Sequence, residues 1–350
     1  MGKKENKERI RGCLIGGAIG DALGWPVEFL KTRDIERKFG PGGIQDLQLS
    51  PSGKAEITDD TQMTLFTAEG VLRSETRAHH KGITHPPSVV FFAYQRWLVT
   101  QGHPRCEDYL GIYDGWLIEV KELYAQRAPG RTCISALRSR KKGTIEEPQN
   151  DSKGCGGVMR VSPAGLLYRG ECAFKMAAEF AALTHGHPSG YLSGGALASI
   201  ISSIMEGKDM EKSIKDALTE LESYPHHHEC GEKLKEALNL AHSTIPAEEA
   251  IYRLGQGWVG EEALAISAYC ALKYQEDFQK ALIAAVNHDG DSDSTGSVTG
   301  NILGAYLGLS NIPASWIEKV ELRDILMQVA DDLDAGFQEG DEWWERYPGY

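Results

Sequence analysis

The chain has 350 residues, of which 41% are hydrophobic and 25% charged, and its formal net charge is −13. This composition is ordinary for a globular protein, and the length allows one large domain or two medium ones. Because the net charge is negative and no stripe of lysine and arginine stands out, the sequence argues against a non-specific nucleic-acid binder. We therefore expect no nucleic-acid partner.

The N-terminus and the cysteines indicate where the protein works. Residues 1–8 are charged, which predicts a flexible N-terminus, and no apolar run of the signal-peptide kind follows them. Nowhere does the sequence approach the roughly 18 consecutive apolar residues of a membrane span. The seven cysteines are scattered and form no C-x-x-C pair, which favours reduced thiols over a disulfide framework. We expect a cytoplasmic monomer with no membrane partner.

The first predicted helix, over residues 10–24, carries glycine at every fourth position. Spacing of four places these glycines on one helix face. Each costs up to about 1 kcal/mol relative to alanine, so four of them indicate that another backbone comes very close. Pro26 marks the end of the helix, and Glu28 lies just beyond it. A second stripe of the same spacing occurs late in the chain, at Gly296, Gly300, Gly304 and Gly308.

Helical periodicity continues through most of the chain. A loop rich in glycine, proline and serine at 40–57 precedes a helix that starts near residue 58. Convincing strands are nearly absent, and there is no repeat of fixed length. The sequence predicts a compact all-α, multi-helix orthogonal bundle in a single domain, residues 9–350, with an exposed loop excursion at 127–153. Further helices are predicted at 88–99, 107–126, 171–184, 209–222, 231–242, 246–254 and 260–274, and residues 316–335 are amphipathic.

Two acidic segments stand at predicted helix starts. Thr58 is a good N-cap, and Asp59 and Asp60 fall in the first turn, where the helix dipole favours negative charge. The second segment, residues 287–295, reads Asn-His-Asp-Gly-Asp-Ser-Asp-Ser-Thr. Neighbouring carboxylates raise the cost of ionising one another, and hard divalent cations bind such closely spaced oxygens. We interpret the two segments as halves of one metal site that the glycine stripes bring together.

Other interpretations of these segments were weighed. An EF-hand that starts at Asp289 would have Ser294 at its sixth position and Gly300 at its twelfth, so the motif fails twice. The D-x-D-x-T pattern of aspartyl phosphatases matches from Asp291, but it belongs after a buried strand, and the surroundings here are helical. Simple capping of the two helices stays open.

A glycine-rich turn at residues 152–160 precedes an apolar segment. Backbone N–H groups in such a turn can hold a phosphate group. The turn matches neither a Walker A motif nor G-x-G-x-x-G, so alone it is a weak signal. The triplet of histidines at 226–228 is interpreted as an exposed loop.

In chain order, five blocks resemble the motifs of the ADP-ribosylglycohydrolase family. The resemblance runs from about residue 9 to 310, and it implies an all-α fold of that type and an enzyme that removes ADP-ribose from modified protein side chains. The blocks are Gly20-Asp21-Ala22-Leu23-Gly24 with Glu28, Thr58-Asp59-Asp60-Thr61, Gly154 to Arg160, Thr184-His185, and Gly290-Asp291-Ser292-Asp293-Ser294.

The resemblance also implies roles for individual residues. Glu28 would lie beside the metals, either as a ligand or as an acid or base that faces the substrate, and Glu28 or Asp60 would carry the proton in catalysis. The distal ribose and diphosphate would be held by the turn and by His185, and Cys155 stands where some relatives carry asparagine. Two Mg²⁺ or Mn²⁺ ions would be bound by Thr58, Asp59, Asp60, Asp291, Asp293 and Ser294. The residues expected to bind substrate are Ser152, Lys153, Gly154, Cys155, Gly156 and His185.

The expected reaction cleaves the bond between ADP-ribose and a side chain, through a transition state of oxocarbenium character. Two metal ions can orient ribose hydroxyls and activate water. The D-S-D-S-T form resembles the arginine-specific branch, so ADP-ribosyl-arginine is the expected linkage. The alternatives are ADP-ribosyl-serine, a free ADP-ribose derivative, or a catalytically weak ADP-ribose-binding protein. We expect the aromatic tail, residues 343–350, to pack on the last helix.

Overall fold

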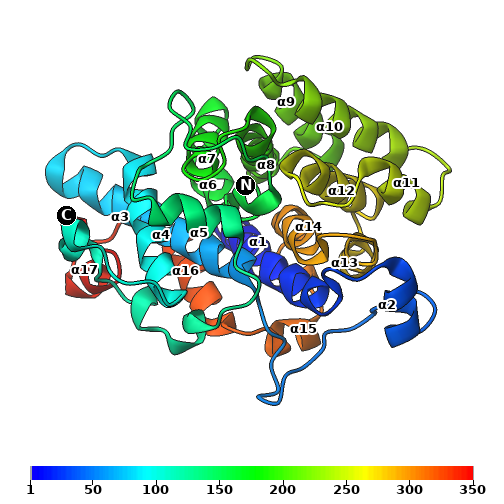
Figure 1. Ribbon diagram of the computed structural model, residues 1–350, viewed down its shortest axis with the longest axis horizontal. Helices are drawn as coiled ribbons and strands as arrows, with labels where there is room; N and C mark the ends of the chain where they lie inside the picture. Colours follow the sequence, from blue (N-terminus) through cyan, green and yellow to red (C-terminus); the bar gives the residue numbers. More distant parts are fainter. Residues whose placement is uncertain (1, 350) are drawn as a thin grey trace.

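Two glycine-striped helices lie side by side at the centre of the computed structural model, which describes residues 2–349 (Figure 1). They are α1 (Lys3–Gly24) and α14 (Ser292–Leu307). A Cβ atom built on a glycine of α1 would lie 2.4 Å or less from a carbonyl oxygen of α14, closer than real side chains come. The predicted backbone contact is therefore confirmed. The glycines that face each other are Gly12 and Gly304, Gly16 and Gly300, and Gly20 and Gly296.

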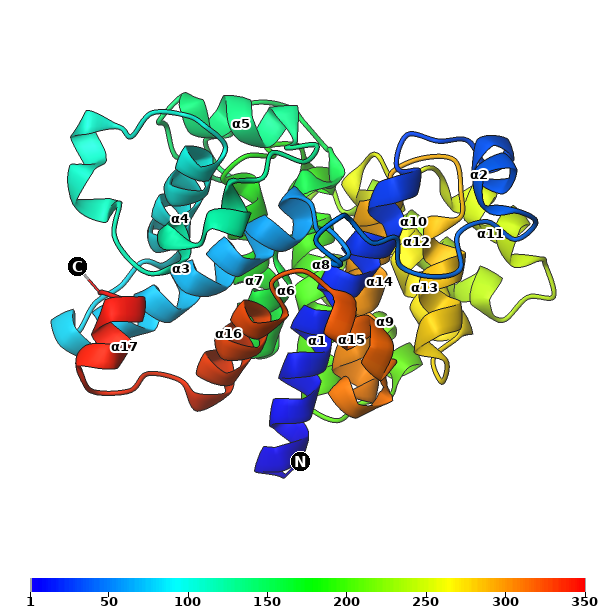
Figure 2. The same ribbon diagram turned by 90° about the horizontal axis from the view of Figure 1, so that it is seen from below.

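The other helices surround this pair, as Figures 1 and 2 show. On one side lie α3 (Asp59–Lys81), α4 (Pro86–Thr100) and α16 (Arg323–Ala335). On the other side lie α8 (Pro188–Met205), α12 (Gly260–Lys273) and α13 (Phe278–Val286). The peripheral helices are α2 (Thr32–Phe39), α5 (Arg131–Arg138), α6 (Ser162–Leu167), α7 (Glu171–Ala182), α9 (Met210–Leu221), α10 (His228–Ala241), α11 (Ala247–Leu254), α15 (Ala314–Lys319) and α17 (Asp341–Arg346).

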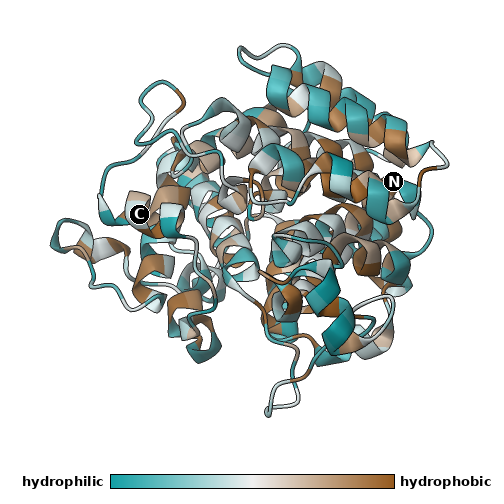
Figure 3. Ribbon diagram, turned by 45° about the vertical axis from the view of Figure 1, so that its right-hand side comes forward, coloured by the Kyte–Doolittle hydropathy of each residue, from teal (hydrophilic) through white to brown (hydrophobic). Residues whose placement is uncertain are grey.

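The predicted all-α fold is confirmed. Residues 2–349 contain no β-strand, and two isolated bridges, Ala55 with Val320 and Gly154 with Val259, join loops to one another. In Figure 3 the peripheral helices alternate between hydrophilic and hydrophobic residues. The helix α9, for example, buries Met210, Ile214, Ala217 and Leu221, which lie on one face.

The central helices are buried along most of their length. Every residue of α14 from Ser292 to Ala305 is buried, and so is α8 from Ser189 to Met205. Within the described chain, no single helix is long and apolar enough to cross a membrane. One bent pair, Lys3–Val27 followed by Thr32–Phe39, meets that criterion together, across a bend of 93°.

The first helix begins earlier than the sequence predicts. Residues 1–8 are predicted as a flexible end, whereas α1 starts at Lys3, and Met1 lies outside the described residues. Contacts with α16 and its neighbourhood hold this first turn. The side-chain amide of Asn6 donates to Asp334 at 2.6 Å, and the ammonium of Lys7 lies 3.1 Å from a carboxylate oxygen of Asp331.

The predicted helix over residues 107–126 is wrong. The segment instead forms three short 3₁₀ turns, η2 (Glu107–Ile112), η3 (Leu117–Glu119) and η4 (Lys121–Tyr124). Gly115 adopts a φ of 90°, which a right-handed helix does not allow, and Tyr109 is also non-helical. Helical periodicity in the sequence gives no information about such local backbone angles.

The aromatic tail packs on the last long helix, as predicted for residues 343–349; Tyr350 lies outside the described residues. The indole N–H of Trp343 donates to the hydroxyl of Thr76 in α3 at 2.9 Å. The hydroxyl of Tyr347 donates to a carboxylate oxygen of Asp332 in α16 at 2.8 Å. Figures 1 and 2 place α17 at the end of the molecule farther from α2.

Replacing Gly300 with alanine should destabilise the protein. The new Cβ would lie 2.0 Å from the carbonyl oxygen of Gly16, and a backbone cannot move aside as a side chain can. Overpacking of this kind costs about 1–3 kcal/mol or more, which exceeds the roughly 1 kcal/mol that alanine gains in helix propensity. Urea unfolding followed by circular dichroism measures the difference in the free energy of unfolding.

The control is Gly111→Ala, where a Cβ would meet nothing within 4 Å. That change should stay within about 0.5 kcal/mol of the wild type. Equal unfolding midpoints for Gly300→Ala and the wild type would show that the contact between α1 and α14 does not need glycine.

Candidate metal centre

The acidic segments meet in one cleft, with a volume of about 380 Å³. Larger cavities exist elsewhere, such as one of about 560 Å³ between α2 and α11, but the carboxylates gather here. Five acids line the cleft, and we call them the cleft carboxylates: Glu28, Asp59, Asp60, Asp291 and Asp293. The other lining residues are Phe29, Ala128, Pro129, Gly130, Arg131, Thr132, Cys133, Gly154, Cys155, Gly156, Met159, His185, Trp258 and Ser294.

Two helix starts bring these acids together. The side chain of Thr58 caps α3 and accepts from the N–H of Asp60 at 3.3 Å. The side chain of Asp291 caps α14 and accepts from the N–H of Ser294, also at 3.3 Å. Capping therefore accounts for one residue of each segment, and Asp59, Asp60 and Asp293 follow in the first helical turns, where the helix dipole favours acidic residues.

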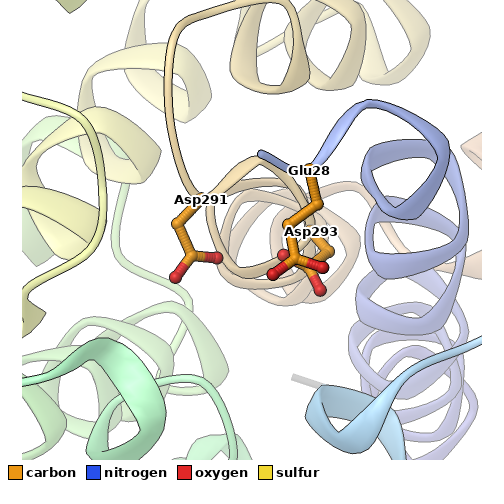
Figure 4. Close-up of side chains that lie close together, drawn as sticks. All are labelled: Glu28, Asp291 and Asp293. Carbon is orange, nitrogen blue, oxygen red and sulfur yellow. The ribbon is translucent and has the colours of Figure 1, made fainter. Parts of the chain in front are cut away.

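The third contribution comes from the end of α1. A Cβ on Gly24 would lie 2.2 Å from the carbonyl oxygen of Ser292, so α1 ends directly against the start of α14. This contact places Glu28, a few residues later, beside the acids of α14. Oxygen atoms of Glu28, Asp291 and Asp293 lie within 4.8 Å of one another, and Figure 4 shows the three side chains pointing into one space.

Burial and mutual repulsion disfavour the ionised forms of the cleft carboxylates. Burial, followed by the charges of Asp293 and Asp291, raises the pKa of Glu28 to about 10. Burial likewise raises the pKa of Asp59 to about 8, although an N–H from Gly130 acts in the opposite direction. Burial and neighbouring carboxylates raise the pKa of Asp60 and of Asp293 well above the ordinary value.

Two carboxylate oxygens in the cleft have no hydrogen-bond partner among residues 2–349. They are Oε2 of Glu28 and Oδ1 of Asp60, and both are buried. A buried acceptor without a donor costs about 1–3 kcal/mol, more if charged. A divalent cation in the cleft would satisfy the oxygen of Asp60 and relieve the repulsion between the acids, so the donor set fits an oxygen-binding ion such as Mg²⁺ or Mn²⁺.

One buried acid was missed as a functional residue by the sequence analysis. Asp21 of α1 accepts hydrogen bonds from the backbone N–H groups of Thr58 and Thr61, at 3.0 and 3.1 Å. It also accepts from the hydroxyl of Thr61 at 2.5 Å. Burial, then the charge of Asp293, raises the pKa of Asp21 to about 7. Asp21 thus fixes the start of α3 beside the cleft carboxylates, and its signal was an acid within the apolar stretch of residues 12–24.

The residues predicted to bind substrate divide into two groups. Gly154, Cys155, Gly156 and His185 line the cleft. The ring Nδ1 of His185 lies 2.8 Å from the hydroxyl of Thr184, and burial lowers the pKa of His185 to about 3, so its ring is neutral.

The remaining predicted residues lie behind the cleft surface. The ammonium of Lys153 pairs with Glu229 and, at 2.6 Å, with Glu261, so its charge is directed away from the carboxylates. The hydroxyl of Ser152 accepts from the N–H of Gly154 at 3.3 Å and thereby shapes the turn. Thr58 is fully buried, and its hydroxyl is the cap of α3.

Part of the predicted loop excursion forms a wall of the cleft. Residues 127–153 are predicted as an exposed loop, whereas 131–138 form the helix α5 and residues 128–133 line the cavity. The N–H of Gly130 donates to Asp59 at 3.0 Å. The guanidinium of Arg127 pairs with Glu321 at 2.6 Å and anchors the segment. These long-range partners leave no local signal in the sequence.

Two aromatic residues at the cleft were also not predicted. The ring of Phe29 is 66% exposed and stacks on Trp258, with 5.2 Å between the ring centres. Phe29 has a φ of 64°, in the left-handed region, directly beside Glu28. Such backbone strain in a bulky residue occurs mostly at functional sites.

The sequence matches one protein family, described as ADP-ribosylglycohydrolase, over residues 3–342. It is 26% identical to the ADP-ribosyl-[dinitrogen reductase] glycohydrolase of Rhodospirillum rubrum, over 94% of this chain and 95% of that protein. It is 25% identical to human ADP-ribosylhydrolase ARH3, over 93% and 94% of the two chains. The identity to the ADP-ribosylarginine hydrolase Tri1 of Serratia proteamaculans is 24%, over 95% of this chain and 80% of that one.

A solved structure shares the fold. It is titled ADP-ribosylglycohydrolase-related protein complex, and the TM-score is 0.68 at 23% identity. The match covers 95% of this chain and 99% of that chain. The arrangement of helices around α1 and α14 is therefore one that a known protein also adopts.

Mg²⁺ should stabilise the protein more at high pH than at low pH. The folded-state pKa values of about 7 for Asp21 and about 8 for Asp59 exceed their ordinary value, so the metal-free fold binds more protons than the unfolded chain. The protonated acids stabilise the metal-free fold fully at low pH. This stabilisation is lost as the pH rises through the pKa values of the folded state. A bound cation removes that loss.

The measurement compares melting temperatures with EDTA and with Mg²⁺ at about pH 5 and about pH 8. The gain from Mg²⁺ should be larger at the higher pH. At each pH the melting temperature with EDTA is subtracted from that with Mg²⁺. Titrations away from the cation, such as that of His185, affect both values equally and cancel. A gain that is equal or smaller at the higher pH would contradict a cation bound by these carboxylates.

Proposed function

This chain belongs to the ADP-ribosylglycohydrolase family, whose members are enzymes, and on this premise we propose that it removes ADP-ribose from modified protein side chains with the help of bound divalent cations. The observation that carries the proposal is the meeting of the cleft carboxylates, from three distant segments, with buried oxygens that lack partners. A protein that only bound ADP-ribose would have no need of so costly a cluster.

We assign two Mg²⁺ or Mn²⁺ ions to the cleft. Asp59 and Asp60 would serve on one side, and Asp291, Asp293 and Ser294 on the other. Thr58 is a further candidate ligand, although it does not line the cleft, because a hydroxyl has two lone pairs and capping of α3 uses only one of them. When bound, such ions orient ribose hydroxyls and stabilise negative charge that develops on oxygen.

Glu28 is the residue that we assign to proton transfer, with Asp60 as the alternative. Each has a buried oxygen without a partner, available to water or to a leaving group. In the reaction, the bond from C1″ of the ribose to the side chain breaks and a water oxygen bonds to C1″. The carboxylate takes a proton from that water and delivers one to the leaving nitrogen.

The glycine-rich turn would hold the diphosphate. Two of its N–H groups are already engaged, that of Gly154 with Ser152 and that of Cys155 with the carbonyl oxygen of Trp258. Gly156 is therefore the position that we assign to phosphate contact. A Cβ there would lie 3.0 Å from the ring of His185, a tight contact that glycine avoids.

ADP-ribosyl-arginine is the linkage that we propose. The D-S-D-S-T form of residues 291–295 supports it, and so does the similarity to a relative named ADP-ribosylarginine hydrolase. A cleft with five carboxylates would also attract the positively charged guanidinium of an arginine side chain. We further propose a monomer in the cytoplasm.

Incubation with arginine-ADP-ribosylated and serine-ADP-ribosylated proteins tests the reaction. ADP-ribose should be released from the arginine substrate with Mg²⁺ or Mn²⁺ present, and EDTA should stop its release. Release from the serine substrate alone would overturn the arginine assignment. Release from neither would remove the enzymatic proposal for protein substrates.

Two substitutions close to the start of α14 separate metal binding from folding. Asp293→Asn should abolish divalent-cation binding, measured by titration calorimetry, together with turnover, because it removes a charged ligand. The matched control is Asp289→Asn. Asp289 accepts from the N–H and hydroxyl of Thr32 and does not line the cleft, so its loss should leave cation binding in place. Full activity in Asp293→Asn would show that the ligands are misassigned.

Glu28→Gln tests the proton carrier. Turnover should fall by about 10²–10⁴-fold, as for loss of a general acid or base, whereas cation binding should survive because four other carboxylates remain. Wild-type turnover in Glu28→Gln with a severe loss in Asp60→Asn would transfer the role to Asp60.

A further inference from the structure

A fully buried arginine without an ion pair lies behind the glycine-rich turn. Arg160 has an exposed fraction of 0%, and no carboxylate of residues 2–349 forms an ion pair with it. The comparably buried Arg96, in contrast, pairs with Glu69 at 2.8 Å. Burying a charge without an opposite charge costs free energy. The presence of Arg160 therefore needs an explanation other than packing.

The guanidinium of Arg160 is bound by neutral groups alone. One amino group donates to the sulphur of Cys133 at 3.1 Å. The other donates to the hydroxyl oxygen of Thr184 at 2.6 Å and to the carbonyl oxygen of Phe180 at 3.3 Å. The ring of Tyr94 lies 4.4 Å from the guanidinium carbon, which gives a cation–π contact. The shortest of these contacts, to Thr184, leads back to the cleft.

The hydroxyl of Thr184 connects Arg160 to His185. Its oxygen lies 2.8 Å from Nδ1 of His185. A guanidinium only donates, so this oxygen accepts from Arg160 and has its single hydrogen left to donate. Two acceptors lie near that hydrogen, Nδ1 and the sulphur of Cys133, and sulphur is the weaker one. The hydroxyl therefore donates to Nδ1.

This hydrogen bond determines which nitrogen of His185 carries the hydrogen. Burial, followed by the charge of Arg160, lowers the pKa of His185 to about 3, so the ring is neutral. A neutral imidazole whose Nδ1 accepts carries its hydrogen on Nε2. Nε2 faces the glycine-rich turn, because a Cβ on Gly154 would lie 3.4 Å from it and one on Gly156 3.3 Å. An N–H donor is thus directed at the turn from a residue that lines the cleft.

We propose that Arg160 and Thr184 are positioning residues, which hold His185 in the one tautomer that offers an N–H to an oxygen of the bound diphosphate. The inference rests on the proposed function, in which the turn holds the diphosphate, and it adds the residues that orient the histidine. Ionised phosphate oxygens only accept hydrogen bonds. The other tautomer of His185 would turn a nitrogen lone pair toward them and would repel them.

Nitrogen NMR of protein labelled with ¹⁵N in histidine and arginine tests the tautomer directly, because protonated and unprotonated ring nitrogens have well-separated chemical shifts. In the wild type, Nε2 of His185 should carry the hydrogen. Thr184→Val removes the hydroxyl at nearly constant volume. It should mix the two tautomers, shift the side-chain N–H signals of Arg160 and weaken ADP-ribose binding by about 3–10-fold, the usual effect of losing one hydrogen bond. Thr184→Ser should restore all three.

Two controls identify the contact that is lost. Thr76 is also fully buried, and its hydroxyl accepts from the indole of Trp343, but it does not line the cleft. Thr76→Val should therefore leave ADP-ribose affinity unchanged. ADP keeps the diphosphate and lacks the second ribose, so its affinity should fall in Thr184→Val as much as that of ADP-ribose. A fall for ADP-ribose alone would show that the N–H contacts the ribose and would overturn the diphosphate assignment.

The outcomes separate this inference from the proposed function. A wild-type His185 with its hydrogen on Nδ1, or a folded Thr184→Val that binds ADP-ribose as tightly as the wild type, would overturn the inference while the enzymatic activity stands. Unchanged signals of Arg160 in Thr184→Val would overturn the role of Arg160. A wild type that releases ADP-ribose from neither protein substrate would instead overturn the proposed function. Circular dichroism establishes that each variant is folded.

Discussion

The backbone contact between α1 and α14 is the constraint on which the rest of the structure depends. Facing glycines let two buried helices approach until a Cβ atom on either would meet the carbonyl oxygens of the other. The contact continues to Gly24, which lies against the first turn of α14. Because Glu28 follows α1 and Asp293 opens α14, this packing determines where the two acids meet. The low helix propensity of the glycines is offset by the burial that the close approach permits.

The cleft holds five carboxylates in a buried position, where their ionised forms are disfavoured without a bound cation. Burial raises the pKa of each cleft carboxylate, and repulsion adds to the shift in all of them except Asp291, so the metal-free centre is destabilised whenever the acids ionise. The packing of the surrounding helices stabilises this arrangement, and Asp21 holds the start of α3 by its hydrogen bonds. A bound cation relieves the repulsion, which links metal binding to stability and reactivity.

The sequence predicted those parts of the site that have periodic or local signals. The spacing of Gly12 to Gly24 predicted the central contact, and the two acidic helix starts predicted that their acids would meet. The residues that it missed depend on contacts between distant segments. The wall at 128–133 is held by Arg127 and Glu321, and the charge of Lys153 is taken by Glu229 and Glu261. The break at Gly115 reflects a backbone angle that helical periodicity does not reveal.

The most direct measurement of the central claim is anomalous diffraction from crystals of the protein soaked in Mn²⁺. The account predicts manganese in the cleft, bound on one side by Asp59 and Asp60 and on the other by Asp291 and Asp293. That result would show that the helix contact assembles one metal centre from two halves of the chain. Manganese found only outside the cleft would contradict this account. So would manganese bound by one acid pair with no ligand from the other pair.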